Sequence, residues 1–303
     1  MKKTLFSIRW FRHWFILIFF VHSSVSYSRQ VTIGLFPGTE MKALFFSVVS
    51  GNYKVLLNDT IELNASEGTL FFLQPAKNGF LLSDSVNSIG IFRKIYLKST
   101  GDQNIFQFKP ILPLMKSFDY DDDLVLVSEN GNIKATNSVN IEKYIAGVIE
   151  AEGGSNALPE FYKAQGILVR TYLFRNVYRH ASEGFILCNT THCQAYKGRS
   201  MLNYEIYEAV KATEGLVLAD SGNNPVMAAY HSNCGGMTIT SDMVWQNHVE
   251  CLQSIHDPFC ENSRNYRWTK RIPLNQWNEY LKRNGIEIQT INYLQNTGVR
   301  QKT

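Results

Sequence analysis

Turn residues divide the stretch between residues 31 and 112 into short apolar or alternating runs, and this feature constrains the fold more than any other. Short runs separated by Gly, Asn, Pro and Asp are typical of β-strands joined by tight turns. The runs cover residues 31–36, 44–49, 53–57, 69–73, 80–82 and 89–97. We therefore predict a β-rich N-terminal region over residues 29–115, and its pattern indicates no function of its own.

The first 28 residues have the layout of a secretory signal peptide. Four basic residues come first, then an uncharged apolar run over residues 14–21, then the small-residue pattern Ser26-Tyr27-Ser28. A short membrane anchor is the alternative, but this apolar run falls well short of the roughly 20 residues that span a bilayer. We predict cleavage after residue 28, export, and no transmembrane span in the mature chain.

Removing that segment also removes the net positive charge of the chain. The full chain has 30 Lys and Arg residues against 26 Asp and Glu residues, and residues 1–28 contain four of the basic ones. The mature chain is therefore balanced and carries no basic stripe interleaved with aromatic residues. These features argue against nucleic acid as a partner.

Residues 124–136 carry the signal of a β-hairpin. Two apolar runs flank Asn130-Gly131, and Asn-Gly accepts the positive φ angles of a tight turn. The acidic run just before it, residues 119–123, resembles the start of an EF-hand calcium loop. Leu124 stands where that loop needs its sixth-position glycine, so we predict a solvated turn without calcium.

Two helices are predicted after the hairpin. Asn140 can cap a helix over residues 141–152, and Gly153-Gly154 can end it. Pro159 suits the first position of a second helix, which is predicted to run to about Tyr178. Strands followed by helices predict the α+β fold class.

Glu152 falls on the apolar side of the first predicted helix. At about 100° per residue, Ile141, Ile145 and Val148 lie within roughly 40° of it, whereas Glu150 lies about 200° away and is predicted to face water. Burial and the negative end of the helix dipole would both favour the protonated carboxyl. Such a group suits general-acid catalysis of glycosidic cleavage, and a glutamate at the rim of the core is the alternative.

Five sequence segments resemble, in order, the motifs of the SpoIID (stage II sporulation protein D) family. The first segment contains a pair of motifs. One is a helix that ends in Gly147-Val148 and Glu152, and the other is a following helix with the pattern Lys-Ala-Gln…Arg-Thr-Tyr. The matching segments are residues 140–152 with 163–172, Cys193 to Gly198, Ala209 to Gly215, Ala229 to Gly236, and Val244-Trp245 with Leu252 and Asp257. The chain has Glu150 where the family commonly has proline and Gly153 where it commonly has methionine.

This resemblance implies a mixed α/β SpoIID-like catalytic domain over residues 116–275, followed by a C-terminal extension over residues 276–303. It implies a peptidoglycan lytic transglycosylase that cleaves the bond between N-acetylmuramic acid and N-acetylglucosamine on peptide-stripped glycan strands. Glu152 maps onto the catalytic glutamate of the family without a gap. Arg170 is a candidate to orient Glu152 or a sugar, or else forms a salt bridge between helices. The candidate substrate-binding residues are Gln165, Tyr172, Ser232, Gly235 and Gly236.

Cysteine and histidine residues cluster just after the second predicted helix. His180, Cys188, His192 and Cys193 supply two thiolates and two imidazoles, which suit a closed tetrahedral site for structural zinc. Some SpoIID-like proteins are similar in carrying such a zinc. A Cys188–Cys193 disulfide is the alternative in an oxidising compartment. With zinc in that group, Cys234 and Cys260 would be free to form a disulfide, which would leave Cys251 unpaired.

The resemblance also implies a place and partners for the chain. We predict a location in the periplasm or cell envelope, glycan strands of peptidoglycan as the substrate, and a cell-wall amidase or other envelope protein as a partner. The alternative function is a non-catalytic wall-binding module of the kind found in amidase enhancers. A thiol-dependent hydrolase using Cys193 with His192 or His231 is a third possibility.

Overall fold

The computed structural model describes residues 30–201, 203–263 and 265–286. The predicted signal peptide and the last part of the predicted C-terminal extension lie outside these residues. Among the helices of the described ranges, none combines the length and the apolar character needed to cross a membrane.

Strands dominate the first half of the chain, as the sequence predicts. Each predicted run falls on a strand, except that residues 89–97 form two strands with a break at Arg93. The strands are β1 Gln30–Leu35, β2 Ala43–Ser50, β3 Asn52–Leu57, β4 Ile61–Ser66, β5 Leu70–Ala76, β6 Gly79–Ser83, β7 Ser88–Phe92, β8 Lys94–Ser99, β9 Ile105–Leu112, β10 Phe118–Asp121, β11 Asp123–Glu129, β12 Asn132–Asn140 and β13 Leu187–Cys188.

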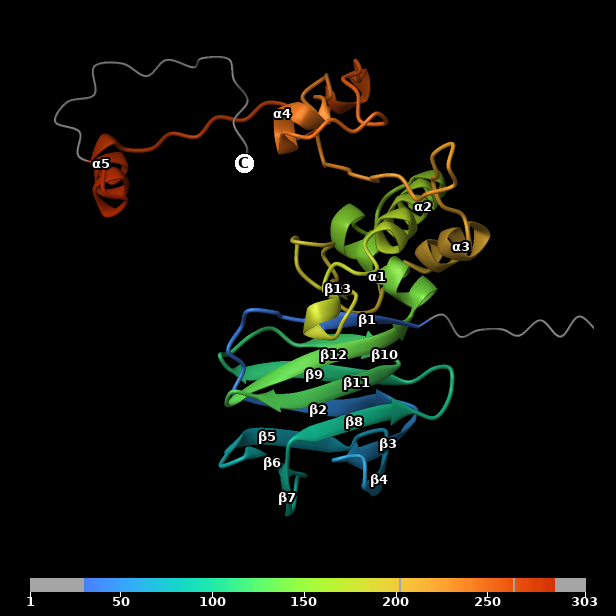
Figure 1. The fold of residues 1–303 in the computed structure, drawn as a ribbon, viewed down its shortest axis with the longest axis vertical. Coiled ribbons are helices and arrows are strands. Elements are labelled where there is room, and N and C mark those ends of the chain that lie inside the picture. Colours follow the sequence, from blue (N-terminus) through green and yellow to red (C-terminus); the bar gives the residue numbers. More distant parts are fainter. Residues whose placement is uncertain (1–29, 202, 264, 287–303) are drawn as a thin grey trace, which may run out of the picture.

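Within the described ranges these strands form two sheets, drawn in the lower half of Figure 1. One has the order β13-β1-β12-β11-β8-β3-β4, and the other has the order β10-β9-β2-β5-β6-β7. Neighbouring strands are antiparallel except β1 and β13. Both sheets join strands from the two sides of residue 115, and the domain boundary at that residue stays a prediction.

Alternating apolar side chains from both sheets fill one core. On β3, for example, Tyr53, Val55 and Leu57 are buried while Lys54 faces solvent. The other sheet adds stacked aromatic rings such as Phe46 on Phe71, with 4.9 Å between ring centroids. Such offset aromatic pairs add to the stabilisation from apolar burial.

The hairpin and the helix that follows it form as predicted. Glu129 pairs with Asn132 across a turn in which Asn130 and Gly131 have φ angles of 51° and 75°. The side chain of Asn140 then accepts hydrogen bonds from the N–H groups of Glu142 and Lys143, and so caps helix α1, Ile141–Gly153. The hairpin therefore leads directly into the helix that carries Glu152.

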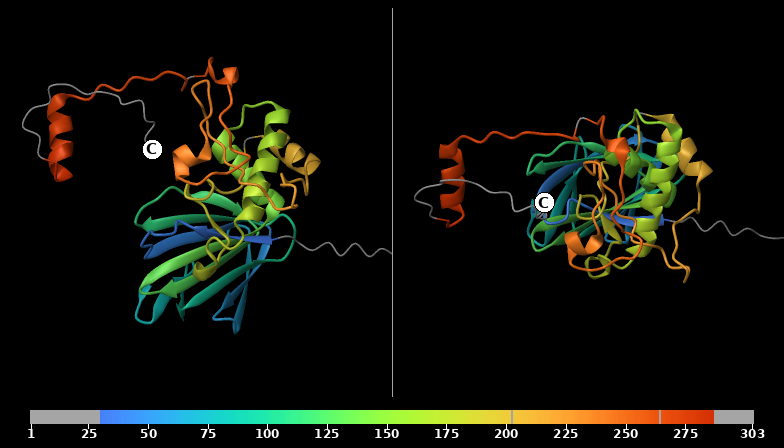
Figure 2. Two further views of the ribbon diagram at one scale, coloured as in Figure 1. Left: turned by 45° about the horizontal axis from the view of Figure 1, so that its top comes forward. Right: turned by 90° about the horizontal axis from the view of Figure 1, so that it is seen from above.

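Helices α1, α2 and α3 pack together at one end of the sheets (Figures 1 and 2). Helix α2, Pro159–Arg175, begins at the predicted proline and ends three residues before the predicted Tyr178. The other helical segments are η1 Ala181–Glu183, α3 Tyr204–Ala212, α4 Ser241–Trp245, η2 Pro258–Cys260 and α5 Leu274–Arg283. The α5 helix stands apart from the sheets in all three views.

The acidic run before the hairpin is buried, so the prediction of a solvated turn is wrong. Asp121, Asp122 and Asp123 are each less than 10% exposed. Asp122 accepts hydrogen bonds from the Asn140 N–H at 2.8 Å and from the Lys143 ammonium at 2.6 Å. Buried carboxylates need such partners, and here they tie the acidic run to the first turn of α1.

Candidate functional site

Glu152 lies in the last turn of α1, where its side chain is exposed to solvent. One carboxylate oxygen, Oε1, accepts a hydrogen bond from the Ala195 N–H at 2.7 Å. Among the described residues, no donor is found for its other oxygen. The prediction that Glu152 continues the buried stripe is therefore wrong, although Ile141, Ile145 and Val148 are buried as predicted.

Glu150 is half-buried, although the sequence predicts that it faces water. Its carboxylate accepts hydrogen bonds from the Ser200 hydroxyl at 2.6 Å and from the Met201 N–H at 3.0 Å. Neighbouring segments cover α1 on most of its sides between Tyr144 and Ile149, where every residue is buried. A helical wheel with a single apolar stripe cannot describe a helix that is covered in this way.

Arg170 contacts Glu142, not Glu152, so its predicted role in orienting Glu152 is wrong. The guanidinium is fully buried, with Nε 3.2 Å and Nη2 2.5 Å from the two carboxylate oxygens of Glu142. Its Nη1 donates to the Leu216 carbonyl at 3.0 Å. Arg170 therefore joins α2 to α1 and to the segment after α3, which is the salt-bridge alternative that the sequence left open.

A cluster of tyrosines and glutamines lies between Glu152 and the cysteine–histidine group. The buried Tyr144 hydroxyl donates to Gln194 Oε1 at 3.2 Å, and Gln194 Nε2 donates to the Tyr230 hydroxyl at 3.5 Å. Burial, and then the negative charge of Glu152, raise the pKa of Tyr230 to about 12. Tyr230 is therefore a neutral hydroxyl at physiological pH.

The sequence predictions missed Tyr230 and Gln194, although both lie inside segments whose sequence was compared with the motifs above. Of the predicted substrate-binding residues, Gln165 is buried and hydrogen-bonds with Tyr230. Tyr172 is half-buried beside Cys193, and burial raises its pKa. Tyr230 could have been found from the sequence, because it directly precedes His231-Ser232.

His180, Cys188, His192 and Cys193 meet as predicted, and this group could hold a metal ion. The donor atoms of the four side chains all lie within 4.8 Å of one another. His180 Nε2 is 3.3 Å from Cys193 Sγ, and His192 Nδ1 is 3.7 Å from Cys188 Sγ and 3.8 Å from Cys193 Sγ. Bonds of 2.0–2.3 Å in a tetrahedron separate neighbouring ligands by about 3.3–3.8 Å, so these donors fit a zinc ion.

Contacts around the group favour metal ligation over a disulfide. The second ring nitrogen of His180 lies 2.5 Å from a carboxylate oxygen of Glu183, which is the outer contact that usually orients a ligating histidine. Cys188 and Cys193 are free thiols in the structure, as are Cys234, Cys251 and Cys260. Cys234 and Cys260, which the sequence leaves free to form a disulfide, are not bonded in the structure, and their sulfur atoms lie 3.3 Å apart.

The loop that contains Ser232, Gly235 and Gly236 follows Tyr230 directly. Gly235 donates its N–H to the Asn233 side chain at 2.7 Å, and the Gly236 carbonyl accepts from the Asp257 N–H at 2.9 Å. Both glycines have positive φ angles, 70° and 95°, which a side chain would disfavour. No hydrogen bond within the described ranges joins this loop to Glu152, and its contact with substrate stays a prediction.

A groove of about 520 Å³ lies beside the end of α1. Its lining includes Gly147, Glu150, Ala151 and Gly154 of α1 and its cap. The rest of its lining includes residues 116–119 and 197–199. Glu152 does not line this groove: it lies about 100° around the helix from Ala151 and about 200° from Glu150, so its carboxylate is on another side of α1.

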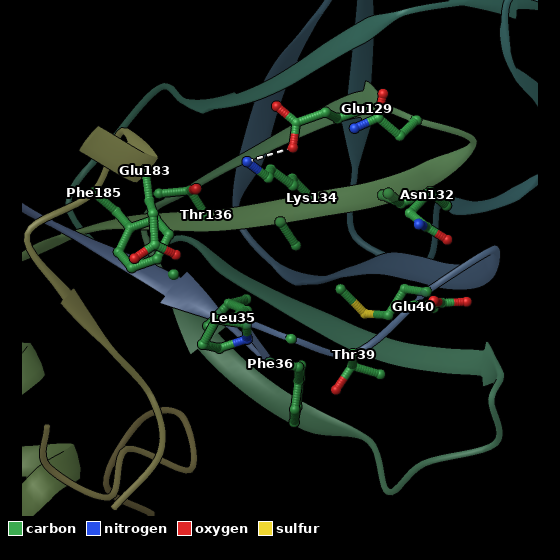
Figure 3. Close-up of a pocket in the computed structure, with 17 residues that line it drawn as sticks. Leu35, Phe36, Thr39, Glu40, Glu129, Asn132, Lys134, Thr136, Glu183 and Phe185 are labelled. Carbon is green, nitrogen blue, oxygen red and sulfur yellow. Dashed lines mark ion pairs between the residues drawn. The ribbon is translucent and has the colours of Figure 1, made fainter. Parts of the chain in front are cut away.

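A second pocket, of about 230 Å³, lies on the β-rich region (Figure 3). It is lined by the end of β1, the segment that follows it and the β11–β12 hairpin, and the Glu129–Lys134 ion pair stands at its edge. None of the predicted site residues lines it. None of them lines the groove beside α1 either, and that groove shares helix α1 with Glu152.

Comparison with known proteins relates one part of the chain to a family. The model of the family described as "SpoIID: Stage II sporulation protein" matches residues 129–219, which contain α1, α2, α3 and the cysteine–histidine group. We call residues 129–219 the SpoIID segment. This SpoIID segment includes Glu152 and Ala195, whereas Tyr230 and the Cys234 loop lie beyond it.

Relatives of the chain come from Brachyspira and Bacillus. It is 28% identical over 198 residues to an uncharacterized protein of Brachyspira hyodysenteriae, covering 65% of this chain and 50% of the relative. Stage II sporulation protein D of Bacillus subtilis is 27% identical over 163 residues, 49% of this chain and 47% of that protein. The amidase enhancer of Bacillus subtilis is 35% identical over 108 residues, 36% of this chain and 14% of that protein. The chain thus spans at most half the length of these relatives.

The structure explains the glycine that opens the SpoIID motif. A side chain at Gly147 would collide with the Gly198 carbonyl and the Tyr196 ring, because the segment after Ala195 crosses α1 at this point. Gly198 has a φ angle of 92° and is itself packed against the Asp119 carbonyl. Gly147 therefore lets this segment approach α1 closely, and the same segment brings the Ala195 N–H to Glu152.

Proposed function

We propose that the chain is a peptidoglycan lytic transglycosylase in which Glu152 is the acid and base. The observation that carries this proposal is the solvent-exposed carboxylate of Glu152 at the end of α1, with Oε1 held by the Ala195 N–H at 2.7 Å. One oxygen is thereby oriented while the other is left to exchange a proton. A positioned carboxyl group within reach of a glycosidic oxygen is the requirement for general-acid catalysis.

The proposed reaction needs only one carboxyl group. Glu152 protonates the oxygen that leaves the anomeric carbon of N-acetylmuramic acid. The hydroxymethyl oxygen of the same sugar attacks that carbon, and Glu152 takes its proton, which leaves an anhydro-muramyl end. Because the nucleophile is part of the substrate, proximity replaces the second carboxylate of hydrolytic glycosidases.

Substrate binding would supply the dry environment that Glu152 lacks in the free protein. The carboxyl group is exposed in the structure, and a sugar lying over it would displace its water. Desolvation favours the protonated carboxyl.

Charges in the groove support peptide-stripped glycan as the substrate. Lys197 is exposed, and Lys116 is exposed over the Phe118 ring, with its Nζ 5.7 Å from the ring centroid. The acidic residues of the same groove have partners, since Asp119 accepts from Gln107 and Glu150 from Ser200. Removing the stem peptide exposes a lactyl carboxylate on each muramic acid, and the two lysines would attract it.

The test is product analysis after incubation of the purified chain with glycan strands freed of stem peptides. Mass spectrometry should detect anhydro-muramyl products from the wild type, and Glu152→Gln should reduce their rate by about 100-fold or more. Glu160→Gln is the matched control, because Glu160 is also an exposed acid near a helix end. Equal rates for Glu152→Gln and the wild type would exclude the catalytic proposal.

The same geometry also suits a non-catalytic module that binds the wall and stimulates an amidase. The exposure of Glu152 and the similarity to an amidase enhancer favour this second candidate. Adding the chain to a cell-wall amidase that digests peptidoglycan separates the two. The module would raise amidase turnover equally as wild type and as Glu152→Gln, without anhydro-muramyl products.

Either function places the protein at the cell envelope after export. This placement rests on the Bacillus relatives, which are described as a sporulation protein and an amidase enhancer, and on the predicted signal peptide. The peptidoglycan glycan strand is the proposed substrate or ligand, and the proposed protein partner is a cell-wall amidase. Zinc is the proposed ion of the cysteine–histidine group, where it would hold the segment that leads into Ala195.

A further inference from the structure

Two cysteines and an aspartate meet outside the SpoIID segment, in the part of the chain that follows Tyr230. Cys234 Sγ is 3.3 Å from Cys260 Sγ and 3.1 Å from Asp257 Oδ2, and Cys260 Sγ is 3.4 Å from the same carboxylate oxygen. The three donor atoms thus form a nearly equilateral triangle. We propose that Cys234, Asp257 and Cys260 bind a divalent cation of the Zn²⁺ class, separately from the cysteine–histidine group.

The size of the triangle suits a metal ion. Each corner lies about 1.9 Å from the centre, which is slightly less than the bonds of 2.0–2.3 Å that zinc forms with carboxylate and thiolate ligands. An ion at bonding distance would therefore sit about 1 Å above the plane of the donors. Both thiols donate to Asp257 Oδ2 in the structure, and a bound ion would replace these two thiol protons.

Hydrogen bonds between two backbone segments hold the donors in place. Asp257 N–H donates to the Gly236 carbonyl at 2.9 Å, and Thr238 N–H donates to the Ile255 carbonyl at 2.9 Å. The Cys234 N–H also points at Cys260 Sγ, at 3.4 Å. An N–H donor to sulfur stabilises a thiolate, and such outer contacts are typical of metal sites.

Asp257 distinguishes a metal site from a disulfide. The sulfur separation of 3.3 Å is well beyond the roughly 2.05 Å of a disulfide bond. A disulfide needs no carboxylate, whereas Asp257 supplies the third ligand of the proposed site. Three protein ligands leave a fourth position that water or another donor can fill.

Such a site would fix the backbone path of the segment that carries Tyr230. Cys234 follows Tyr230 by four residues, and Tyr230 contacts Gln194 at the candidate active site. A cation at the triangle would anchor this segment to residues 254–260. The proposal stands independently of the chemistry proposed for Glu152.

The test counts zinc atoms and free thiols in the full chain, purified without added reductant. Zinc per chain is measured by mass spectrometry of the metal after dialysis, for the wild type, Asp257→Asn and Cys260→Ser. Each of these two variants should carry one zinc fewer than the wild type. Cys251→Ser is the matched control, because Cys251 is an exposed cysteine outside both donor groups, and it should keep the wild-type zinc content.

A second measurement keeps the result independent of zinc loading. Cobalt added to the metal-free chain should give thiolate-to-cobalt absorption, and this absorption should weaken in Asp257→Asn. Circular dichroism checks that each variant folds. Unchanged zinc in Asp257→Asn, or a Cys234–Cys260 disulfide found by peptide mass spectrometry after trapping free thiols, would overturn the proposal.

Discussion

Replacing Glu142 with glutamine tests how the helices around the candidate site are held together. Arg170 is fully buried, and the Glu142 carboxylate that neutralises it retains 23% of its side-chain exposure. Removing one partner of a buried ion pair typically costs 3–5 kcal/mol, because the other charge stays buried without compensation. Since Glu142 is partly hydrated and glutamine keeps one acceptor, we expect a loss near the lower end, about 3 kcal/mol.

The assay is denaturant unfolding followed by circular dichroism, supported by thermal melting. For a domain of this size, about 3 kcal/mol corresponds to a drop in Tm of roughly 6–12 °C. The matched control is Glu160→Gln, which breaks the exposed Glu160–Lys163 pair and should cost about 0.5 kcal/mol or less. The anhydro-muramyl rate per folded molecule should fall far less in Glu142→Gln than in Glu152→Gln.

Two results would refute this reasoning. A loss below about 1 kcal/mol in Glu142→Gln, similar to that of the exposed control, would mean that Arg170 does not depend on this carboxylate. Full stability combined with a complete loss of product would instead assign the Glu142–Arg170 pair to the reaction itself.

Three further outcomes are expected. Gly147→Ala should lower the free energy of unfolding by about 1–3 kcal/mol in the same assay, because its methyl group would collide with the Gly198 carbonyl. An unchanged denaturant midpoint would contradict the close approach of the Gly198 segment to α1. Glu152→Gln should lower the pKa of Tyr230 from about 12, since the carboxylate charge that opposes tyrosine ionisation is lost; NMR titration of labelled tyrosine would detect this change, and a rise would contradict it. Zinc at 100 times its dissociation constant should stabilise the metal-free chain by about 2.7 kcal/mol. His192→Ala should weaken this stabilisation in thermal melts. An equal shift in Tm for the wild type and His192→Ala would place the zinc outside the cysteine–histidine group.

Local patterns predicted the parts of this fold that depend on neighbouring residues in the sequence. The Asn130-Gly131 turn, the Asn140 cap and the start of α2 at Pro159 all form as predicted. Each depends on backbone angles and hydrogen bonds that a few consecutive residues decide. The grouping of Cys188, His192 and Cys193 was predictable for the same reason, because they lie within six residues.

Predictions that depended on which side of an element is covered were less successful. The period of α1 placed Glu150 and Glu152 about 200° apart, but the segment from Gly198 to Met201 packs over the side that was predicted to face water. The acidic run was predicted to be a solvated turn, because the sequence does not show that α1 begins beside Asp122.

The sequence by itself determined the α+β class, the hairpin that leads into α1, and the glutamate at the end of that helix. Only the tertiary structure decided that Arg170 pairs with Glu142, that Ala195 holds Glu152, and that Cys234, Asp257 and Cys260 converge. The physical reason is that periodicity sets the angles between side chains on one element. Packing of segments distant in sequence decides which of those side chains is buried and which partner it meets.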